Sequence, residues 1–553
     1  MIDHKEKTKL LQSKNFKKFG LDFHPQVSLI SAFFVILFMI YAIGFPEHAS
    51  SLFSKFKGSV TKNFNWFFIL SANLFLFIPI YLFFSKLGEV RIGGPEAKPE
   101  FSRFSWYSML ISAGMGIGLM FWSVGEPMYH TQGKLPMLEG TSSASSAMAV
   151  TFFHWGFHPW GIYALISLAL AFFAYNRGLP LSLRSVFYPI FKDRVFGWIG
   201  DLIDILAVIS CLFGLATSLG FGAQQINAGL THLFGLPQSA TVQVVVILII
   251  TLIATLSVVS GIGKGVKFLS ELNIRVALVF MLLIFACGPT IYILRLYSNS
   301  VAEYLQNFIT ISFWVEGDSG SWQGSWTVFY WAWWISWSPF VGLFIARISK
   351  GRTVREFVAA ILLIPSILSF IWMTVFGGTA ISQSLSDGGT LLESVKSNVA
   401  TALYTMIDGL DFSFAAGTWQ VLFSLIGTFL VISFFVTSSD SGSLVVDNLT
   451  SGGKIDSPVF QRIFWAVMEG LIAIALLIAG GKDALNALQT AVVLSGLPFS
   501  LILLMMIYSL HKGLTKDFAF LKRYREDKLA NKIFNEKIHG EFENVEAIKA
   551  RLN

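Results

Sequence analysis

The sequence predicts an all-α integral membrane protein with twelve transmembrane helices. Of its 553 residues, 54% are hydrophobic and only 13% are charged, and the mean hydropathy is +0.65. Soluble globular chains carry about 25% charged residues, so this composition excludes a soluble fold. A helix needs about 20 mostly apolar residues to cross the bilayer core. Twelve runs of this kind follow one another along the chain: 27–45, 66–85, 105–124, 147–174, 199–223, 242–260, 276–296, 325–346, 357–379, 418–438, 460–479 and 485–509.

Basic residues orient these spans. Most of the 40 Lys and Arg residues lie in the N-terminal tail, in alternate loops and in the C-terminal tail, and such residues mark the cytoplasmic side of a membrane protein. We therefore expect a cytoplasmic tail over 1–26, a twelve-helix membrane domain over 27–510 and a charged cytoplasmic tail over 511–553. No small-residue cleavage site follows the first apolar run, so we expect a retained helix and not a signal peptide.

The remaining charges and the cysteines exclude other classes. The net charge of +7 follows from the basic cytoplasmic side and does not indicate nucleic-acid binding. Cys211 and Cys287 lie in apolar spans and offer neither a disulfide framework nor a metal-ligand spacing. Residues 302–311 are expected to form a helix along the outer membrane surface. The tail after Ser509 is interpreted as a charged helix or a loosely ordered end that touches anionic membrane lipid, and a tail that is simply solvated is the alternative.

The third span carries glycines at three alternate positions, Gly114, Gly116 and Gly118. Each glycine costs a helix about 1 kcal/mol relative to alanine. Their spacing places them on different faces, unlike the i, i+4 seam of packed membrane helices. We therefore predict an unwound segment whose free carbonyls line a cavity or hold an ion, because lipid cannot satisfy them. Close helix packing at the glycines is the alternative.

The eighth span reads Tyr-Trp-Ala-Trp-Trp-Ile-Ser-Trp-Ser-Pro-Phe over 330–340, with four tryptophans in seven positions. Such a cluster predicts a wall of π-faces that attracts a cation lacking hydrogen-bond donors, as aromatic cages do for quaternary ammonium groups. A Trp-rich helix that packs against lipid is the alternative. Pro339 predicts an interruption, because proline removes a backbone donor.

Spans 3–7 and 8–12 form two sets of five, and an odd number of spans makes the sets inverted relative to each other. Each set opens with a helix that is predicted to break. Broken helices at matching positions of inverted repeats indicate the central site of a transporter. A secondary transporter is therefore favoured over an ion channel, in which the tryptophans would form a hydrophobic gate. An enzyme is disfavoured, since the sequence shows no nucleophile–base pair, metal cluster or phosphate loop.

The fourth span adds aromatic and titratable side chains. Trp155 and Tyr163 share one helix face, and a bend at Pro159 would bring Trp160 to the same space. The neighbouring histidines, 154 and 158, are either proton carriers or hydrogen-bonding groups of the helix backbone.

The tenth span ends in consecutive hydroxyls, Thr437, Ser438 and Ser439, followed by Asp440. Such groups are costly at membrane depth unless they face water or an ion. Sodium takes oxygen ligands, so two hydroxyls together with carbonyls from an unwound segment form a candidate sodium site. We expect Asp440 to anchor the inner gate through a backbone or Arg contact.

Together these motifs resemble the betaine/carnitine/choline transporter (BCCT) family, over about residues 25–510. The matching segments are Gly114–Gly118, the Trp155, Trp160 and Tyr163 set, the run 331–340, and Phe435 to Ser438. The resemblance implies a LeuT-type 5+5 inverted repeat, helices 3–7 and 8–12, preceded by two extra helices. It also implies a transporter of the bacterial inner membrane, no cofactor besides a coupling ion, substrates with a trimethylammonium group, and often a homotrimer.

The family pattern also implies roles for individual residues. The aromatic box would consist of Trp155, Trp160, Tyr163 and Trp334. Further substrate contacts would come from Trp333 beside the box, Trp331 and Trp337 along the pathway, and Gly114, Met115, Gly116 and Gly118 at the broken helix. Sodium would be held by backbone oxygens of Ser112, Met115 and Phe434 and by the hydroxyls of Thr437 and Ser438.

Differences between this chain and some members of the family indicate which substrate and which coupling ion to expect. Proton-coupled choline carriers of the family resemble this chain but have aspartate in place of Gly118 and tyrosine in place of Trp155. Gly118 is expected instead to leave room for the carboxylate of a zwitterion. The resemblance therefore implies sodium-coupled uptake of glycine betaine, with a proton-coupled choline or carnitine transporter as the alternative. Cys211 and Leu215 stand where sodium-driven relatives have two threonines, which puts a second sodium in doubt.

Overall fold

The computed structural model describes residues 5–114, 116–133, 135–140, 142–259, 263–317, 321–412, 415–454 and 457–539. This part of the chain is mostly helical and has isolated β-bridges but no β-strand. The predicted spans correspond to α2 (Pro25–Gly44), α3 (Pro46–Phe84), α4 (Arg103–Gly114) with α5 (Ile117–Gln132), α6 (Ala144–Trp155) with α7 (Phe157–Arg177), α10 (Trp198–Phe234), α11 (Ala240–Val259), α12 (Gly263–Cys287), α16 (Thr327–Ile348), α17 (Val354–Ser386), α20 (Ala416–Thr450), α21 (Val459–Gly480) and α22 (Ala484–His539).

The count of twelve spans is confirmed. Within the described ranges, 11 spans are long and apolar enough to cross a membrane, and the bent pair of α4 and α5 provides the twelfth. Shorter helices connect them: α1 (Lys5–Ser13), α8 (Leu183–Val186), α9 (Tyr188–Phe191), α13 (Thr290–Gln306), α14 (Phe308–Phe313), α15 (Trp322–Ser325), α18 (Thr390–Ser397) and α19 (Ala402–Asp408). Single 3-10 turns occupy Lys86–Glu89, Pro136–Leu138, Lys192–Phe196, Val399–Thr401 and Gly481–Asp483.

Helices of the two sets of five pack in reciprocal pairs. α5 packs against α17 while α7 packs against α16, and α10 packs against α21 while α11 packs against α20. Likewise, α10 contacts α22 and α12 contacts α20. Each contact between a helix of the first set and a helix of the second is thus matched by a contact between the counterparts of these two helices. A two-fold relation between two copies of one motif produces such a pattern, in agreement with the predicted inverted repeat.

The predicted boundaries around the end of the seventh span were wrong. The seventh span was predicted to reach residue 296, but α12 ends at Cys287, and α13 starts at Thr290 after the Gly288-Pro289 break. The expected surface helix over 302–311 is divided between α13 and α14.

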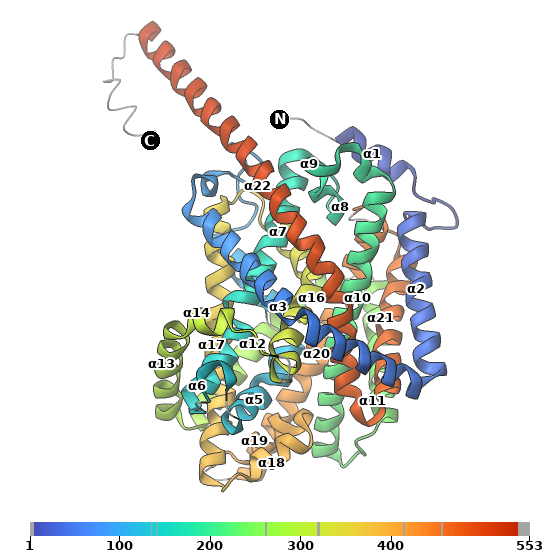
Figure 1. Ribbon diagram of the computed structural model, residues 1–553, viewed down its shortest axis with the longest axis vertical. Helices are drawn as coiled ribbons and strands as arrows, with labels where there is room; N and C mark the ends of the chain where they lie inside the picture. Colours follow the sequence, from blue (N-terminus) through green and yellow to red (C-terminus); the bar gives the residue numbers. More distant parts are fainter. Residues whose placement is uncertain are drawn as a thin grey trace.

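The helix of the last span continues well past residue 509, to His539, and Figure 1 shows it projecting from the same end of the molecule at which α1 lies. The described part of the tail is therefore a charged helix with mostly exposed side chains, and its contact with lipid stays a prediction. Arg525 of this extension pairs with Glu89 at 2.7 Å, which ties the extension to the turn that follows α3.

Of the three predicted helix breaks, one is confirmed, one is shifted and one is absent. α4 ends at Gly114 and α5 begins at Ile117, and the two helices differ in direction by 62°. The fourth span breaks at Gly156 and not at Pro159. Proline causes no break there because it lies in the first turn of α7, where backbone N–H groups have no helical partner. α16 continues through Pro339.

Neighbouring side chains explain the two exceptions. A Cβ atom on Gly156 would lie 2.5 Å from the Phe370 ring, so only glycine allows α17 to approach the break this closely. In α16, Pro339 cannot bond to the carbonyl of Ile335. The Ser338 hydroxyl donates to that carbonyl instead, at 2.7 Å, and the helix continues.

Candidate functional site

A cavity of about 130 Å³ lies beside the break between α4 and α5. Its walls come from α4, α5, α7, α12, α16, α17 and α20, together with Trp155 at the end of α6. None of its described lining residues is charged. The predicted site residues that line it are Ser112, Gly116, Gly118, Trp155, Trp160, Tyr163, Trp334, Trp337, Phe434, Thr437 and Ser438.

Four rings of this lining contact one another edge to face. Trp334 meets Trp155 with a centroid distance of 4.9 Å and an interplanar angle of 75°, and it meets Tyr163 at 6.3 Å and 80°. Tyr163 in turn meets Trp160 at 5.3 Å and 78°. The structure therefore gathers two distant segments of the chain into one aromatic group, of the kind that surrounds a quaternary ammonium group.

The other tryptophans of α16 lie in different positions. Trp337 lines the cavity, and Trp333 stacks behind Trp334 with centroids 4.9 Å apart. Trp331 is not part of the cavity lining, because it points toward α7 and stacks on His158 at 5.3 Å. The predicted substrate contacts on α16 thus divide into lining, supporting and remote residues.

The glycines of the broken helix differ in the space around them. A Cβ atom on Gly118 would lie 2.8 Å from the Trp333 ring and 3.1 Å from the Trp155 ring. The Trp333 and Trp155 rings therefore occupy the position that a side chain at residue 118 would take, while Gly118 itself lines the cavity. That Gly118 leaves room for a substrate carboxylate stays a prediction. A Cβ atom on Gly116 would meet only Trp337, at 4.0 Å, so the open space lies there.

Oxygen-bearing groups of α4 and α20 line the same cavity. Four of the predicted sodium ligands are among them: Ser112, Phe434, Thr437 and Ser438. The Thr437 hydroxyl donates to backbone carbonyls of its own helix, with that of Ser433 at 3.0 Å and that of Phe434 at 3.2 Å, and its oxygen accepts from Asn273 at 3.4 Å. Its hydrogen is thus directed to the helix, which leaves the oxygen to act as an acceptor. Met115, the remaining predicted ligand, lies outside the described residues, and Gly114 before it ends α4.

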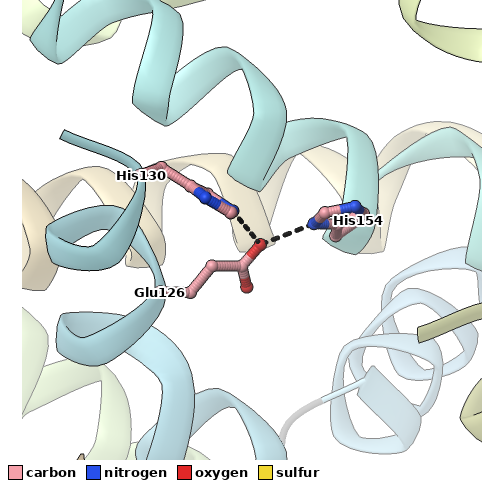
Figure 2. Close-up of side chains that lie close together, drawn as sticks. All are labelled: Glu126, His130 and His154. Atoms are coloured by element: carbon pink, nitrogen blue, oxygen red, sulfur yellow. Dashed lines mark hydrogen bonds and ion pairs between the residues drawn. The ribbon is translucent and has the colours of Figure 1, made fainter. Parts of the chain in front are cut away.

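Sequence reasoning missed a buried carboxylate beside the rings, Glu126 of α5. Figure 2 shows that it lies between His130 and His154, whose nitrogens are 3.3 and 2.7 Å from Oε1. Its other oxygen, Oε2, accepts from Nε1 of Trp155 at 2.6 Å and from the Tyr330 hydroxyl at 2.5 Å. The third span was predicted to end at residue 124, whereas α5 continues to Gln132, so Glu126 fell outside the predicted span. An acidic residue within an apolar helix would have been the signal.

The same three side chains have the ligand types of a metal site. Their ligand atoms lie within 4.8 Å of one another. Both Glu126 oxygens, however, are occupied by N–H and O–H donors, and Nε2 of His154 is bonded to Thr327 at 3.0 Å. We therefore interpret the group as a hydrogen-bond network between α5, α6 and α16. The network contacts two rings of the aromatic group. Trp155 donates to Glu126, and Nε1 of Trp334 donates to the backbone carbonyl of His154 at 3.0 Å.

A family comparison agrees with this geometry. The model of the betaine/carnitine/choline family transporters matches residues 26–519. The chain belongs to this family. It is therefore a multi-pass membrane transporter of the betaine class and not an enzyme.

Curated BCCT relatives are similar over almost the whole chain. A glycine betaine/proline/choline/ectoine transporter of Vibrio parahaemolyticus is 50% identical over 512 residues, which cover 91% of this chain and 90% of that protein. Glycine betaine transporter 1 of the same species is 47% identical, with coverage of 90% and 95%. A glycine betaine transporter of Acinetobacter baylyi is 41% identical, with coverage of 93% and 77%.

The polar residues that the sequence left open find side-chain partners in this BCCT transporter. His154 contacts Glu126 and Thr327, and His158 bonds to Asn73 at 2.9 Å, so side chains and not backbone groups hold both imidazoles. Asp440 was expected to make a backbone or Arg contact, but its carboxylate accepts from the Ser257 hydroxyl of α11 at 3.1 Å.

The crowding at Gly118 gives a testable prediction for the BCCT transporter. Gly118→Ala is expected to displace the Trp155 and Trp333 rings and to raise the KM for glycine betaine uptake, with a strain of about 1 to 3 kcal/mol. Gly58→Ala on α3 is the matched control, since its added methyl group has open space and Gly58 lies outside the cavity lining. Initial uptake rates over a range of substrate concentrations measure both variants. Equal KM values for the two would contradict the ring contacts at Gly118.

Proposed function

We propose that this transporter imports glycine betaine, or a close trimethylammonium zwitterion, by sodium symport. The observation that carries the proposal is the group of four rings in a cavity without charged lining residues. The rings suit the donor-free cationic end of such a substrate. A zwitterion brings its own negative charge, so it needs no acidic residue in the site, whereas a bare cation such as choline would lack a counter-charge.

The names of the relatives support this substrate class. Glycine betaine appears in the names of the three relatives described above, while proline, choline and ectoine appear only in the longest of these names. We therefore rank glycine betaine first and treat the broader set as further candidates for this chain.

Sodium as the coupling ion rests on the oxygen groups of α4 and α20. Thr437 and Ser438 face the substrate cavity together with Ser112, and hard cations such as sodium take oxygen ligands. Cys211 and Leu215 are fully buried and offer no side-chain oxygen. We propose a single sodium ion for each substrate.

Topology and assembly form part of the proposal. The distribution of basic residues supports a bacterial inner-membrane location with both termini in the cytoplasm. The described ends, α1 and the extension of α22, lie at the same end of the molecule (Figure 1), as such a topology requires. By family resemblance we propose a homotrimer embedded in membrane lipid.

Labelled glycine betaine uptake into proteoliposomes tests the function. Accumulation driven by an imposed sodium gradient alone is the expected result. Accumulation driven only by a proton gradient would replace sodium symport by the alternative, proton-coupled uptake, with choline and carnitine as the next substrates to test. Equilibration without accumulation would contradict secondary active transport and favour a channel.

Thr437→Ala and Ser438→Ala are expected to weaken sodium activation more than substrate binding. A hydrogen-bond-type interaction with a charged group contributes about 1.5 to 3 kcal/mol, which corresponds to roughly a tenfold or larger rise in the sodium concentration for half-maximal uptake. Ser441→Ala is the matched control, because Ser441 lines the same cavity from the same helix. If all three variants respond alike to sodium, the assignment of these hydroxyls is wrong.

A further inference from the structure

A second buried carboxyl group, that of Glu469, lies apart from the substrate cavity. The residue belongs to α21, which packs against both α10 and α20. Its side chain is 0% exposed, and it is not among the described lining residues of the cavity. The transport mechanism proposed above makes no use of this group.

The carboxyl oxygens of Glu469 are poorly satisfied. Oε2 accepts one long hydrogen bond from the Ser439 hydroxyl, at 3.4 Å, and Oε1 has no hydrogen-bond partner among the described residues. Among the described residues, no Lys, Arg or His lies within ion-pair distance of the Glu469 carboxyl group. Glu126, by contrast, has four donors around its two oxygens.

The surroundings of Oε1 are apolar and tightly packed. The group lies against the backbone of α20 at Gly442, where an added Cβ atom would be 3.2 Å from Oε1. The same Cβ atom would lie 2.7 Å from the side chain of Leu215 on α10. The missing side chain of Gly442 therefore provides the space in which the carboxyl group sits, and Leu215 closes that space.

Few charged groups act on Glu469 from neighbouring helices. Asp440 on α20 and the Cys211 thiol on α10 are near enough to interact with it electrostatically. Neither is a cation. α2, α11 and the part of α22 up to Leu510 contain no charged residue. Lys57 of α3 bonds to Asn486 at the start of α22.

A carboxylate that is buried without a cation and with a single weak donor is strongly unfavourable, so the group carries a proton in this conformation. We propose that Glu469 is a proton-binding site, and that it exchanges its proton with water as α20 moves during transport. Ser439, its one donor, directly follows Ser438 of the proposed sodium site, so a movement of α20 at the ion site changes the surroundings of Glu469. The link to transport rests on the proposed function.

Infrared spectroscopy of the full-length protein in lipid tests the protonation itself. At neutral pH, the wild type is expected to show the C=O stretching band of a protonated carboxylic acid. Glu469→Gln should lose this band, while Glu393→Gln, which changes an exposed carboxylate on α18, should keep it. A band that persists unchanged in Glu469→Gln would overturn the proposal, whatever the transported substrate is.

Proton movement during uptake tests the coupling. Proteoliposomes with a pH-sensitive dye inside should report proton movement when glycine betaine is added to the wild type or to Glu469→Asp, but none with Glu469→Gln. Uptake by the wild type should depend on pH, and uptake by Glu469→Gln should not. Substrate binding by Glu469→Gln, followed by tryptophan fluorescence, checks that the protein is folded.

The two tests separate the two proposals. Proton movement by Glu469→Gln equal to that of the wild type, or betaine uptake by the wild type without proton movement, would overturn the coupling. No betaine uptake by the wild type under any gradient would contradict the proposed function, while the infrared result would still decide whether Glu469 holds a proton.

Discussion

Replacing Trp334 by leucine is expected to raise the KM for glycine betaine by at least about tenfold. Trp334 is the central ring of the aromatic group, in contact with both Trp155 and Tyr163, and it is only 6% exposed. A desolvated cation–π contact contributes about 2 kcal/mol, and about 1.4 kcal/mol corresponds to a factor of ten in affinity. Leucine keeps an apolar surface but has no π-face, so the change removes this attraction.

Trp331→Leu is the control, because Trp331 lies on the same helix but outside the cavity lining. Its loss should lower the thermal stability of the protein without changing the KM of properly folded transporter. Uptake kinetics and thermal unfolding in detergent are measured for both variants. If Trp334→Leu transports with the KM of the wild type, the aromatic group does not bind the substrate.

The membrane spans could be predicted because length and apolar composition decide them locally. The helix breaks depended on more than the local sequence. The glycines that separate α4 and α5 weaken the helix by themselves, and their break was predicted correctly. Pro339 breaks nothing, because Ser338 compensates for the missing backbone donor, and Gly156 breaks the fourth span where Phe370 of a distant helix approaches. Only the packed structure contains these contacts.

The cavity lining shows the same division. The aromatic residues were found because π-faces are rare at this density in one span. Glu126 was missed since its partners Trp155 and Tyr330 stand 29 and 204 positions away in the chain. The crowding around Gly118 could not be predicted for a similar reason, because the Trp333 ring that lies against it comes from α16. Residue types indicated the chemistry, while the arrangement of α5, α6 and α16 determined which groups meet.

Glu126→Gln is expected to lower the stability of the transporter and to raise its KM for glycine betaine. The two Glu126 oxygens face four donors, and the Trp155 indole N–H is a donor only. An amide NH2 group would place a further donor against these donors. Removing one partner from a buried charged network costs about 3 to 5 kcal/mol. Trp155 would also lose the hydrogen bond that fixes its ring in the cavity wall.

A double-mutant cycle separates the two consequences. Glu126→Gln and Trp155→Phe are made singly and together, and KM and the thermal unfolding temperature are measured for each variant. If Glu126 acts on the substrate through the orientation of Trp155, the change in KM of the double variant will be smaller than the sum of the changes in the two single variants. The reason is that the second substitution removes a hydrogen bond that the first has already removed. Glu303→Gln, which alters a partly buried acid that accepts from Ser146 at 3.2 Å, should leave KM unchanged. Additive effects on KM would show that Glu126 supports the fold without positioning the ring.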